Sequence, residues 1–311
     1  MKRKVMKVAE SSALISLPYK WVKQHNIQKG DELEVEEKGN SIIIRTDSFH
    51  SDKEVEVDIS ELDRTTIMYV IRSFYRLGYD SVKLIFKDPT TIYQRKGKDI
   101  SVISVIHTEI NRLIGYEIMQ EKENFCIIKD LQGTSDKDFE QVLRRIFLLL
   151  QDTVEEFIDG AKKNKKPMLE SIENRHDTIT KFVSHCLRLL SKRGKDIGKT
   201  ANNYHIIASL DRITDIIKYS ARDLIESNIK ISKETADIFN LTKENLLEFY
   251  EIYYKYNNEK IQNINERRYK AEKKLKALKP ENTIEIITAS KIFTISEILL
   301  DLIESRTALN Y

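Results

Sequence analysis

Pairs of acidic residues four positions apart recur in the C-terminal half of the chain, and this spacing can hold a metal ion. Four residues advance an α-helix by about 400°, so both side chains lie on one face within reach of one cation. Carboxylate oxygens suit divalent or trivalent cations such as magnesium, manganese, iron or zinc. We single out three of these pairs: Glu173 with Asp177, Asp211 with Asp215, and Glu297 with Asp301. Helices rich in acidic residues also produce this spacing by chance, so a solvated acidic face is the alternative.

The start of the chain carries basic side chains that could neutralise DNA phosphates. The first 23 residues contain only one acidic residue, Glu10, beside these basic ones: Lys2, Arg3, Lys4, Lys7, Lys20 and Lys23. Neutralising phosphates releases counterions and favours binding to duplex DNA. In a dimer these charges double. The alternative is a lysine-rich, solvated N-terminus with no partner.

Long amphipathic helices are expected to carry the acidic pairs. From residue 135 onward, apolar residues recur with the period of an α-helix. The pattern predicts six helices, at about 136–163, 167–192, 200–227, 232–254, 260–278 and 281–307. A break near residues 228–230 separates three helices from three more, which suggests a duplicated three-helix unit.

Residues 54–131 alternate between predicted strands and helices. We expect strands at 55–59, 82–86, 117–119 and 125–128, with helices at 61–77 and 101–114. Ser60 is expected to cap the first helix, and Gly78 and Gly115 to end the two helices. The pattern predicts a compact α+β middle domain.

Residues 1–47 are predicted to be a small β domain with one short helix. Residues 5–9 and 13–17 are predicted to be extended, Pro18 opens a helical turn, and residues 33–36 and 42–44 alternate as a hairpin. A unit of this size cannot bury its strands alone. We therefore expect it to pair with a second copy in a homodimer.

Composition excludes several classes of protein. A length of 311 residues suggests two or three domains, and 41% hydrophobic residues exclude a wholly disordered chain. The net charge of +3 is small, so a nucleic-acid role depends on local clustering. The two cysteines, Cys126 and Cys186, are too far apart in sequence for a CxxC site. Without a signal peptide or a long apolar run, we expect a cytoplasmic protein with no membrane insertion.

Motifs of the common enzyme classes are missing. The sequence contains no Gly-rich phosphate-binding motif and no G-x-S-x-G turn. The single E-x-x-H, from Glu173 to His176, lacks the second copy that a di-iron site needs. We therefore expect no enzymatic activity, and a metal-dependent hydrolase is the least favoured alternative.

The N-terminal run KVAESSALISLPYKWVKQHNIQKGDELEVEEKGNSIIIRT resembles the AbrB/SpoVT family of DNA-binding domains. The features that match are the "ISLP" segment, the short helix, the turn at Lys29-Gly30-Asp31 and the two closing strands. The resemblance implies a swapped-hairpin β-barrel formed by two interlocked chains. It also implies that DNA is contacted near the first strand, the next loop and the helix start, at Arg3, Lys4, Lys7, Ser11, Ser12, Lys20 and Lys23. Lysine and serine stand where arginines are common, which favours phosphate contact over base readout.

The C-terminal region resembles the PhoU family. The segments ENRHDTITKFVSHCLRLL and ASLDRITDIIKYSARDLIE carry acidic boxes of the PhoU kind, most clearly at Asp211–Asp215. The resemblance implies an all-α bundle of two three-helix repeats. Some proteins of the PhoU family bind metal clusters at these acidic boxes. In the second repeat Phe293 stands where the first acid belongs. We therefore expect at most one metal site, at Glu173, Asp177, Asp211 and Asp215, helped by Glu297 and Asp301.

Together the resemblances imply a multidomain α+β protein: a DNA-binding head (1–47), a middle domain (54–131) and a PhoU-like helical domain (135–308). We expect a dimeric regulator of phosphate uptake and phosphate homeostasis that binds duplex DNA. The alternative is an adaptor that acts directly on the phosphate transporter ATPase or its sensor and uses the head only to dimerise.

Overall fold

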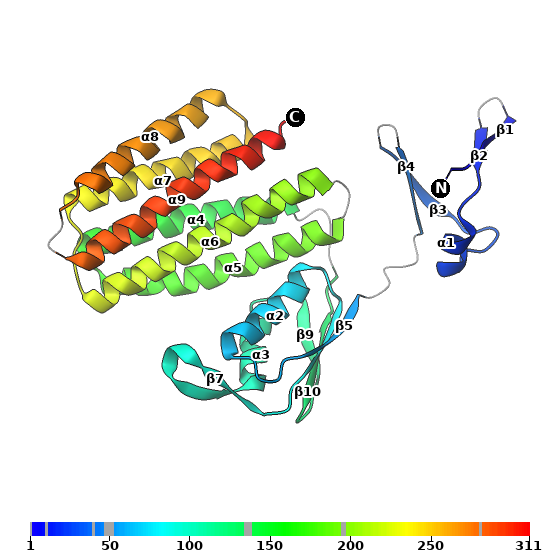
Figure 1. Ribbon diagram of the computed structural model, residues 1–311, viewed down its shortest axis with the longest axis horizontal. Coiled ribbons are helices and arrows are strands. Elements are labelled where there is room, and N and C mark those ends of the chain that lie inside the picture. Colours follow the sequence, from blue (N-terminus) through cyan, green and yellow to red (C-terminus); the bar gives the residue numbers. More distant parts are fainter. Residues whose placement is uncertain are drawn as a thin grey trace. The chain divides into compact units, whose positions relative to one another are not determined.

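A computed structural model describes residues 2–9, 12–38, 41–46, 53–133, 139–193, 197–279 and 282–311. The chain divides into two compact units, Met1–Lys53 and Glu54–Tyr311 (Figure 1). The first unit is the predicted head, called the head below. The second unit contains both the predicted middle domain and the helical region.

The head consists of two hairpins and a short helix. Strand β1 (Val5–Ala9) pairs antiparallel with β2 (Ser12–Ile15), and β3 (Leu33–Lys38) pairs antiparallel with β4 (Ser41–Thr46). Helix α1 (Tyr19–Gln24) follows Pro18, as predicted. The second strand ends at Ile15, two residues before the predicted end at Leu17.

The described side chains of the head form no hydrophobic core. None of its described side chains is buried. Val35 lies opposite Ile44 in the β3–β4 hairpin, so this apolar pair lies on one face, together with Ile42. Val35 is 60% exposed and Ile42 is 65% exposed. The described residues of the head form two separate two-stranded sheets and no closed barrel, so the β-barrel stays a prediction for two chains.

The middle domain is a four-stranded sheet with two helices. Strands β5 (Glu54–Asp58), β6 (Ser81–Ile85), β9 (Tyr116–Glu121) and β10 (Phe125–Asp130) are ordered β5-β6-β10-β9. Only the β5–β6 pair is parallel, because α2 (Arg64–Arg76) connects these strands. Helix α3 (Val102–Ile110) packs on α2, and the buried apolar side chains of both helices and the sheet form a separate core.

Three features of the middle domain differ from the prediction. Helix α2 begins at Arg64 because Asp63, and not Ser60, caps it: its Oδ1 accepts from the Thr66 N–H at 2.9 Å. Helix α3 ends at Ile110, and tight turns lead to Gly115. Gly115 has a φ of +86°, and a Cβ there would lie 2.6 Å from the Asp130 carboxylate, so the position requires glycine.

One hairpin of the middle domain was not predicted from the sequence, because its strands are short and mostly polar. Strand β7 (Thr90–Tyr93) pairs with β8 (Lys98–Ser101), and a 3₁₀ turn over Gln94–Lys96 joins them. Gly97 closes this turn with a φ of +56°.

The described residues of the C-terminal region form six helices, as the periodicity predicted. They are α4 (Phe139–Lys163), α5 (Lys166–Arg193), α6 (Ile197–Ser227), α7 (Lys233–Tyr254), α8 (Asn258–Ala277) and α9 (Thr283–Ala308). The predicted break near residue 228 is confirmed: Asn228 has a φ of +50° and follows the end of α6. Within the described segments, no helix has the length and apolar character needed to cross a membrane.

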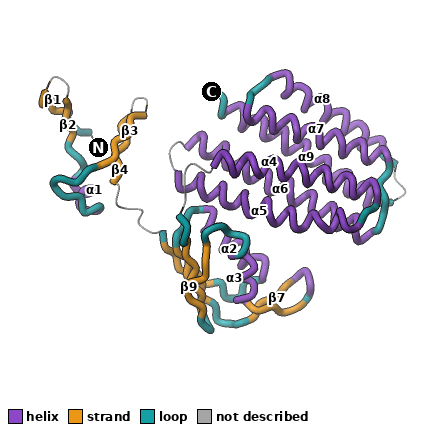
Figure 2. Tube along the Cα trace, turned by 180° about the vertical axis from the view of Figure 1, so that it is seen from behind, coloured by secondary structure: helices purple, strands orange, loops and turns teal. Residues whose placement is uncertain are grey.

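Neighbouring helices share one continuous core. Helix α5 packs against α4 and α6, α6 packs against α9, and α7 packs against α8 and α9 (Figure 1). Figure 2 shows the same helices from behind, with α5 at the side that faces the middle domain.

Arg188 of α5 is wholly buried and binds the middle domain through hydrogen bonds and an ion pair. The Arg188 guanidinium donates to the Tyr75 carbonyl at 2.9 Å, the Tyr79 carbonyl at 2.7 Å and the Asp130 carboxylate at 2.7 Å. It also lies 4.9 Å from the Tyr75 ring centroid and 5.1 Å from that of Tyr116. All four partners belong to the middle domain, so this contact sets how α2 lies on the bundle.

Candidate functional site

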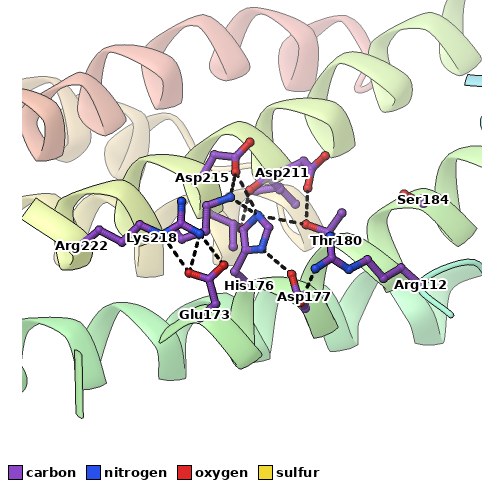
Figure 3. Close-up of polar contacts among 12 residues, drawn as sticks. Arg112, Glu173, His176, Asp177, Thr180, Ser184, Asp211, Asp215, Lys218 and Arg222 are labelled. Atoms are coloured by element: carbon purple, nitrogen blue, oxygen red, sulfur yellow. Dashed lines mark hydrogen bonds and ion pairs between the residues drawn. The ribbon is translucent and has the colours of Figure 1, made fainter. Parts of the chain in front are cut away.

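The acidic pairs of α5 and α6 come together, as the sequence predicted. Glu173 and Asp177 lie one turn apart on α5, and Asp211 and Asp215 lie one turn apart on the adjacent α6 (Figure 3). Two side chains of α5 lie between the pairs: His176 contacts Asp177 and Asp215, and Thr180 donates to Asp211. The four carboxylates with these two side chains are called the acidic cluster below.

Each acid of the cluster has a cationic partner. Arg222 donates twice to Glu173, and Lys218 donates to Asp215. The other two cations come from the middle domain: Arg76 of α2 donates to Asp211 at 2.7 Å, and Arg112 after α3 donates to Asp177 at 2.6 Å. The cluster is therefore part of the contact between the middle domain and the bundle. These partners are 135 and 65 positions away in sequence, which is why no local pattern indicated them.

His176 is buried at the centre of the cluster. Its Nδ1 lies 3.0 Å from Asp177 Oδ1, and its Nε2 lies 2.9 Å from Asp215 Oδ1. Burial lowers the pKa of His176, but the hydrogen bonds to the two carboxylates outweigh burial and the nearby Lys218, so the pKa is raised overall. Although burial opposes it, the hydrogen bonds from His176 and Lys218 lower the pKa of Asp215 to about 2.

These shifts predict how pH changes stability. A raised folded pKa means that His176 contributes stability below the unfolded value of about 6.5 and loses it as pH rises through the folded pKa. Asp215 contributes stability above about pH 4 and loses it as pH falls toward about 2. We expect His176→Gln to lower the melting temperature at about pH 5.5 and to change it much less at about pH 9. Thermal unfolding of both proteins across this range measures the difference, and an equal loss at both values would contradict the assignment.

Metal binding by the acidic cluster stays a prediction. Among the residues that the structure describes, no group of three or more His, Cys, Asp or Glu side chains is arranged to hold a metal ion. In this arrangement a metal would compete with the cations that already contact the acids. Glu297 and Asp301 lie on α9 outside the cluster's contacts, and Glu297 accepts from Arg268 of α8.

Replacing Asp211 and Asp215 by asparagine separates ion pairing from metal binding. The change leaves Arg76 and Lys218 without their carboxylates, so we expect a loss of about 1–3 kcal/mol in the free energy of unfolding. The loss should be the same with a chelator present. If the acids also bind a metal, manganese should raise the melting temperature of the parent and not that of the variant. An unchanged melting temperature without metal would contradict the ion-pair role.

A cavity of about 400 Å³ borders the cluster and extends between the middle domain and helices α5 and α6. The sequence analysis missed the residues that line its other side, on α2 and the β7–β8 hairpin. The sequence pattern that could have indicated a basic surface there is the spacing of Arg64, Arg72 and Arg76, which lie one or two helical turns apart on α2.

The basic residues of the head are exposed. Those described are Lys2, Arg3, Lys4 and Lys7 around β1, and Lys20 and Lys23 on α1. Ser11 lies outside the described residues, and the side chain of Ser12 is not described. Exposed lysines on a strand and a short helix can contact phosphates without rearrangement of a core.

A comparison with family models finds one match in the head. Residues 8–48 match the model described as antidote-toxin recognition MazE, bacterial antitoxin. The head is an AbrB- and MazE-like domain. The match shows a likeness to an antitoxin domain over this part of the chain alone. It does not extend to the helical region, so the PhoU resemblance stays a prediction. No curated protein matches the chain, and no solved structure does.

Proposed function

We propose that this protein is a non-enzymatic, homodimeric regulator that binds duplex DNA through its head. The observation that carries the proposal is the AbrB- and MazE-like head, whose basic side chains are exposed and whose apolar faces are uncovered in one chain. Two copies would bury those faces and double the basic surface. The unit Glu54–Tyr311 would then control how the head is used.

The regulated process that we propose is phosphate uptake. Support comes from the PhoU-like acidic boxes at Glu173–Asp177 and Asp211–Asp215 and from six helices that break into three and three at Asn228. A phosphate transporter ATPase or its sensor would be the partner of the bundle. In the alternative, the protein acts on that partner alone and uses its head only to dimerise.

Salt dependence of duplex binding tests the proposal. A head that binds through phosphates should lose affinity steeply with salt, by about 10³-fold between ~50 and ~200 mM if six or more phosphates are neutralised. Fluorescence anisotropy of a labelled duplex with the full-length protein measures this slope. A dimer that shows no duplex binding at low salt would exclude the regulator and favour the adaptor.

The uncovered face of the β3–β4 hairpin predicts how the dimer can be broken. Aspartate at an exposed position of a monomer usually changes stability by less than about 0.5 kcal/mol. If Val35 is buried between two chains, Val35→Asp should instead dissociate the dimer, because it buries an unpaired charge. Sedimentation velocity measures the mass, and Gln28→Asp, at an exposed residue of the head outside the β3–β4 hairpin, is the control. A Val35→Asp protein that stays dimeric would place the interface elsewhere.

A further inference from the structure

The cavity between the middle domain and the bundle has one wall without acidic side chains. This wall belongs to the middle domain and is formed by α2, the β7–β8 hairpin and the turn after α3. It contains four arginines: Arg64, Arg72, Arg95 and Arg112. The rings of Tyr69 and Tyr93 lie beside them. A volume of about 400 Å³ is in the range of sites for small organic ligands.

The opposite wall, on α5 and α6, is acidic but largely neutralised. Four of its acids belong to the acidic cluster and have the cationic partners described above. A fifth, Asp223, accepts from Lys291 of α9. Glu226 is the acid of this wall for which the described part of the chain provides no cation. A ligand entering the cavity therefore meets fewer free negative charges than the composition of the wall suggests.

Two arginines of the basic wall are free to bind an anion. Neither Arg64 nor Arg95 has a carboxylate partner among the described residues, whereas Arg112 is paired with Asp177. The Arg64 guanidinium lies 4.3 Å from the Tyr93 ring centroid, which holds it in place without neutralising it. Arg72 is oriented by a two-point contact with buried Glu109, at 2.7 and 3.0 Å.

We propose that this cavity binds a small anion that carries a phosphate group. The planar guanidinium matches phosphate oxygens with two parallel hydrogen bonds. A phosphate has enough oxygens to engage Arg64 and Arg95 together, whereas a carboxylate has two. The carboxylates of the opposite wall and the limited volume disfavour a nucleic-acid strand. The free anion and a phosphate ester share this chemistry, and an ester would add contact with the exposed ring of Tyr69 and the half-buried ring of Tyr93.

Isothermal titration of the full-length protein in chloride buffer tests the site with two probes, inorganic phosphate and adenosine monophosphate. We expect at least one to bind with a dissociation constant below about 1 mM. The double variant Arg64→Ala/Arg95→Ala should weaken binding about tenfold or more. Arg145→Ala, an exposed arginine of α4 outside the cavity, is the control and should bind as the parent does. Glu226→Gln should tighten binding, because it removes the unpaired negative charge.

Each outcome decides the proposal. Binding of inorganic phosphate that is lost in the double variant identifies the free anion as sufficient, and binding of the monophosphate alone identifies an ester. Absence of binding by both probes, or binding that the double variant retains, would overturn the site. Duplex binding by the double variant is measured separately, because the cavity lies in the unit Glu54–Tyr311 and not in the head. If the cavity binds no anion, the DNA-binding role proposed for the head is unaffected.

Discussion

Replacement of Arg188 by methionine is expected to lower the free energy of unfolding by about 3–5 kcal/mol. Arg188 is fully buried, and its Asp130 partner is 3% exposed, so the variant leaves a buried carboxylate with only the longer 3.6 Å contact to Lys192 as an ion pair among the described residues. The carbonyls of Tyr75 and Tyr79 each lose one donor in the same change and keep another, the Gly78 N–H and the Tyr116 hydroxyl. Methionine fills a similar volume, so the loss reports on charge and hydrogen bonding and not on a cavity.

Chemical unfolding followed by circular dichroism measures this loss. Lys192→Met is the matched control, because Lys192 is 20% exposed and bridges Asp80 and Asp130 from the edge of the same contact. Its loss should stay near ~1 kcal/mol. An Arg188→Met protein no less stable than Lys192→Met would show that apolar packing of α2 on α5, and not the arginine, joins the middle domain to the bundle.

Charge reversal in the head is expected to abolish duplex binding. Replacement of Lys4, Lys20 and Lys23 by glutamate exchanges three attractive charges in each protomer for three repulsive ones, so affinity should fall by about a thousandfold or more. The corresponding glutamine variant removes the charges without repulsion and should lose less. Both variants should remain dimeric, because the exposed lysines lie outside the apolar faces of the strands.

Net charge alone must be excluded as the cause. Lys163, Lys166 and Lys276 are exposed residues of the helical region, and their replacement by glutamate changes the net charge by the same amount. Anisotropy titrations at one salt concentration compare the variants. Equal losses in the two charge-reversed proteins, or unchanged affinity in the head variant, would contradict DNA binding by this face.

Because the middle domain packs on the bundle, we expect anion binding in the cavity between them to change the stability of the unit Glu54–Tyr311. Arg76 at the C-terminal end of α2 and Arg112 beyond α3 contact the acidic cluster, and Arg188 of α5 contacts Asp130 of β10, so the middle domain contacts the bundle through three separate segments. Arg64 and Arg95 border the same cavity, and neither forms an ion pair with a carboxylate that the structure describes. Binding of an anion there would add a contact that exists only in the folded unit and would stabilise it by mass action.

Local sequence patterns determined most elements of this protein. The helical period in residues 139–308 predicted six helices, and alternation with turn residues predicted the hairpins of the head, because both depend on neighbours a few positions apart. The same reasoning placed Glu173 with Asp177 and Asp211 with Asp215 on adjacent helices. The β7–β8 hairpin was not predicted, because its strands are only four residues long and mostly polar, so they show no clear alternation of apolar and polar residues.

Only the tertiary structure decided what surrounds those acids. Arg76 meets Asp211 across 135 positions, and Arg112 meets Asp177 across 65, because the middle domain docks on α5. Spacing along one helix shows which side chains share a face, but the partner of a charge depends on which distant surface covers that face. The acidic pairs could be predicted from the sequence, whereas their neutralisation by arginines and the basic wall of the cavity depend on how the two parts pack.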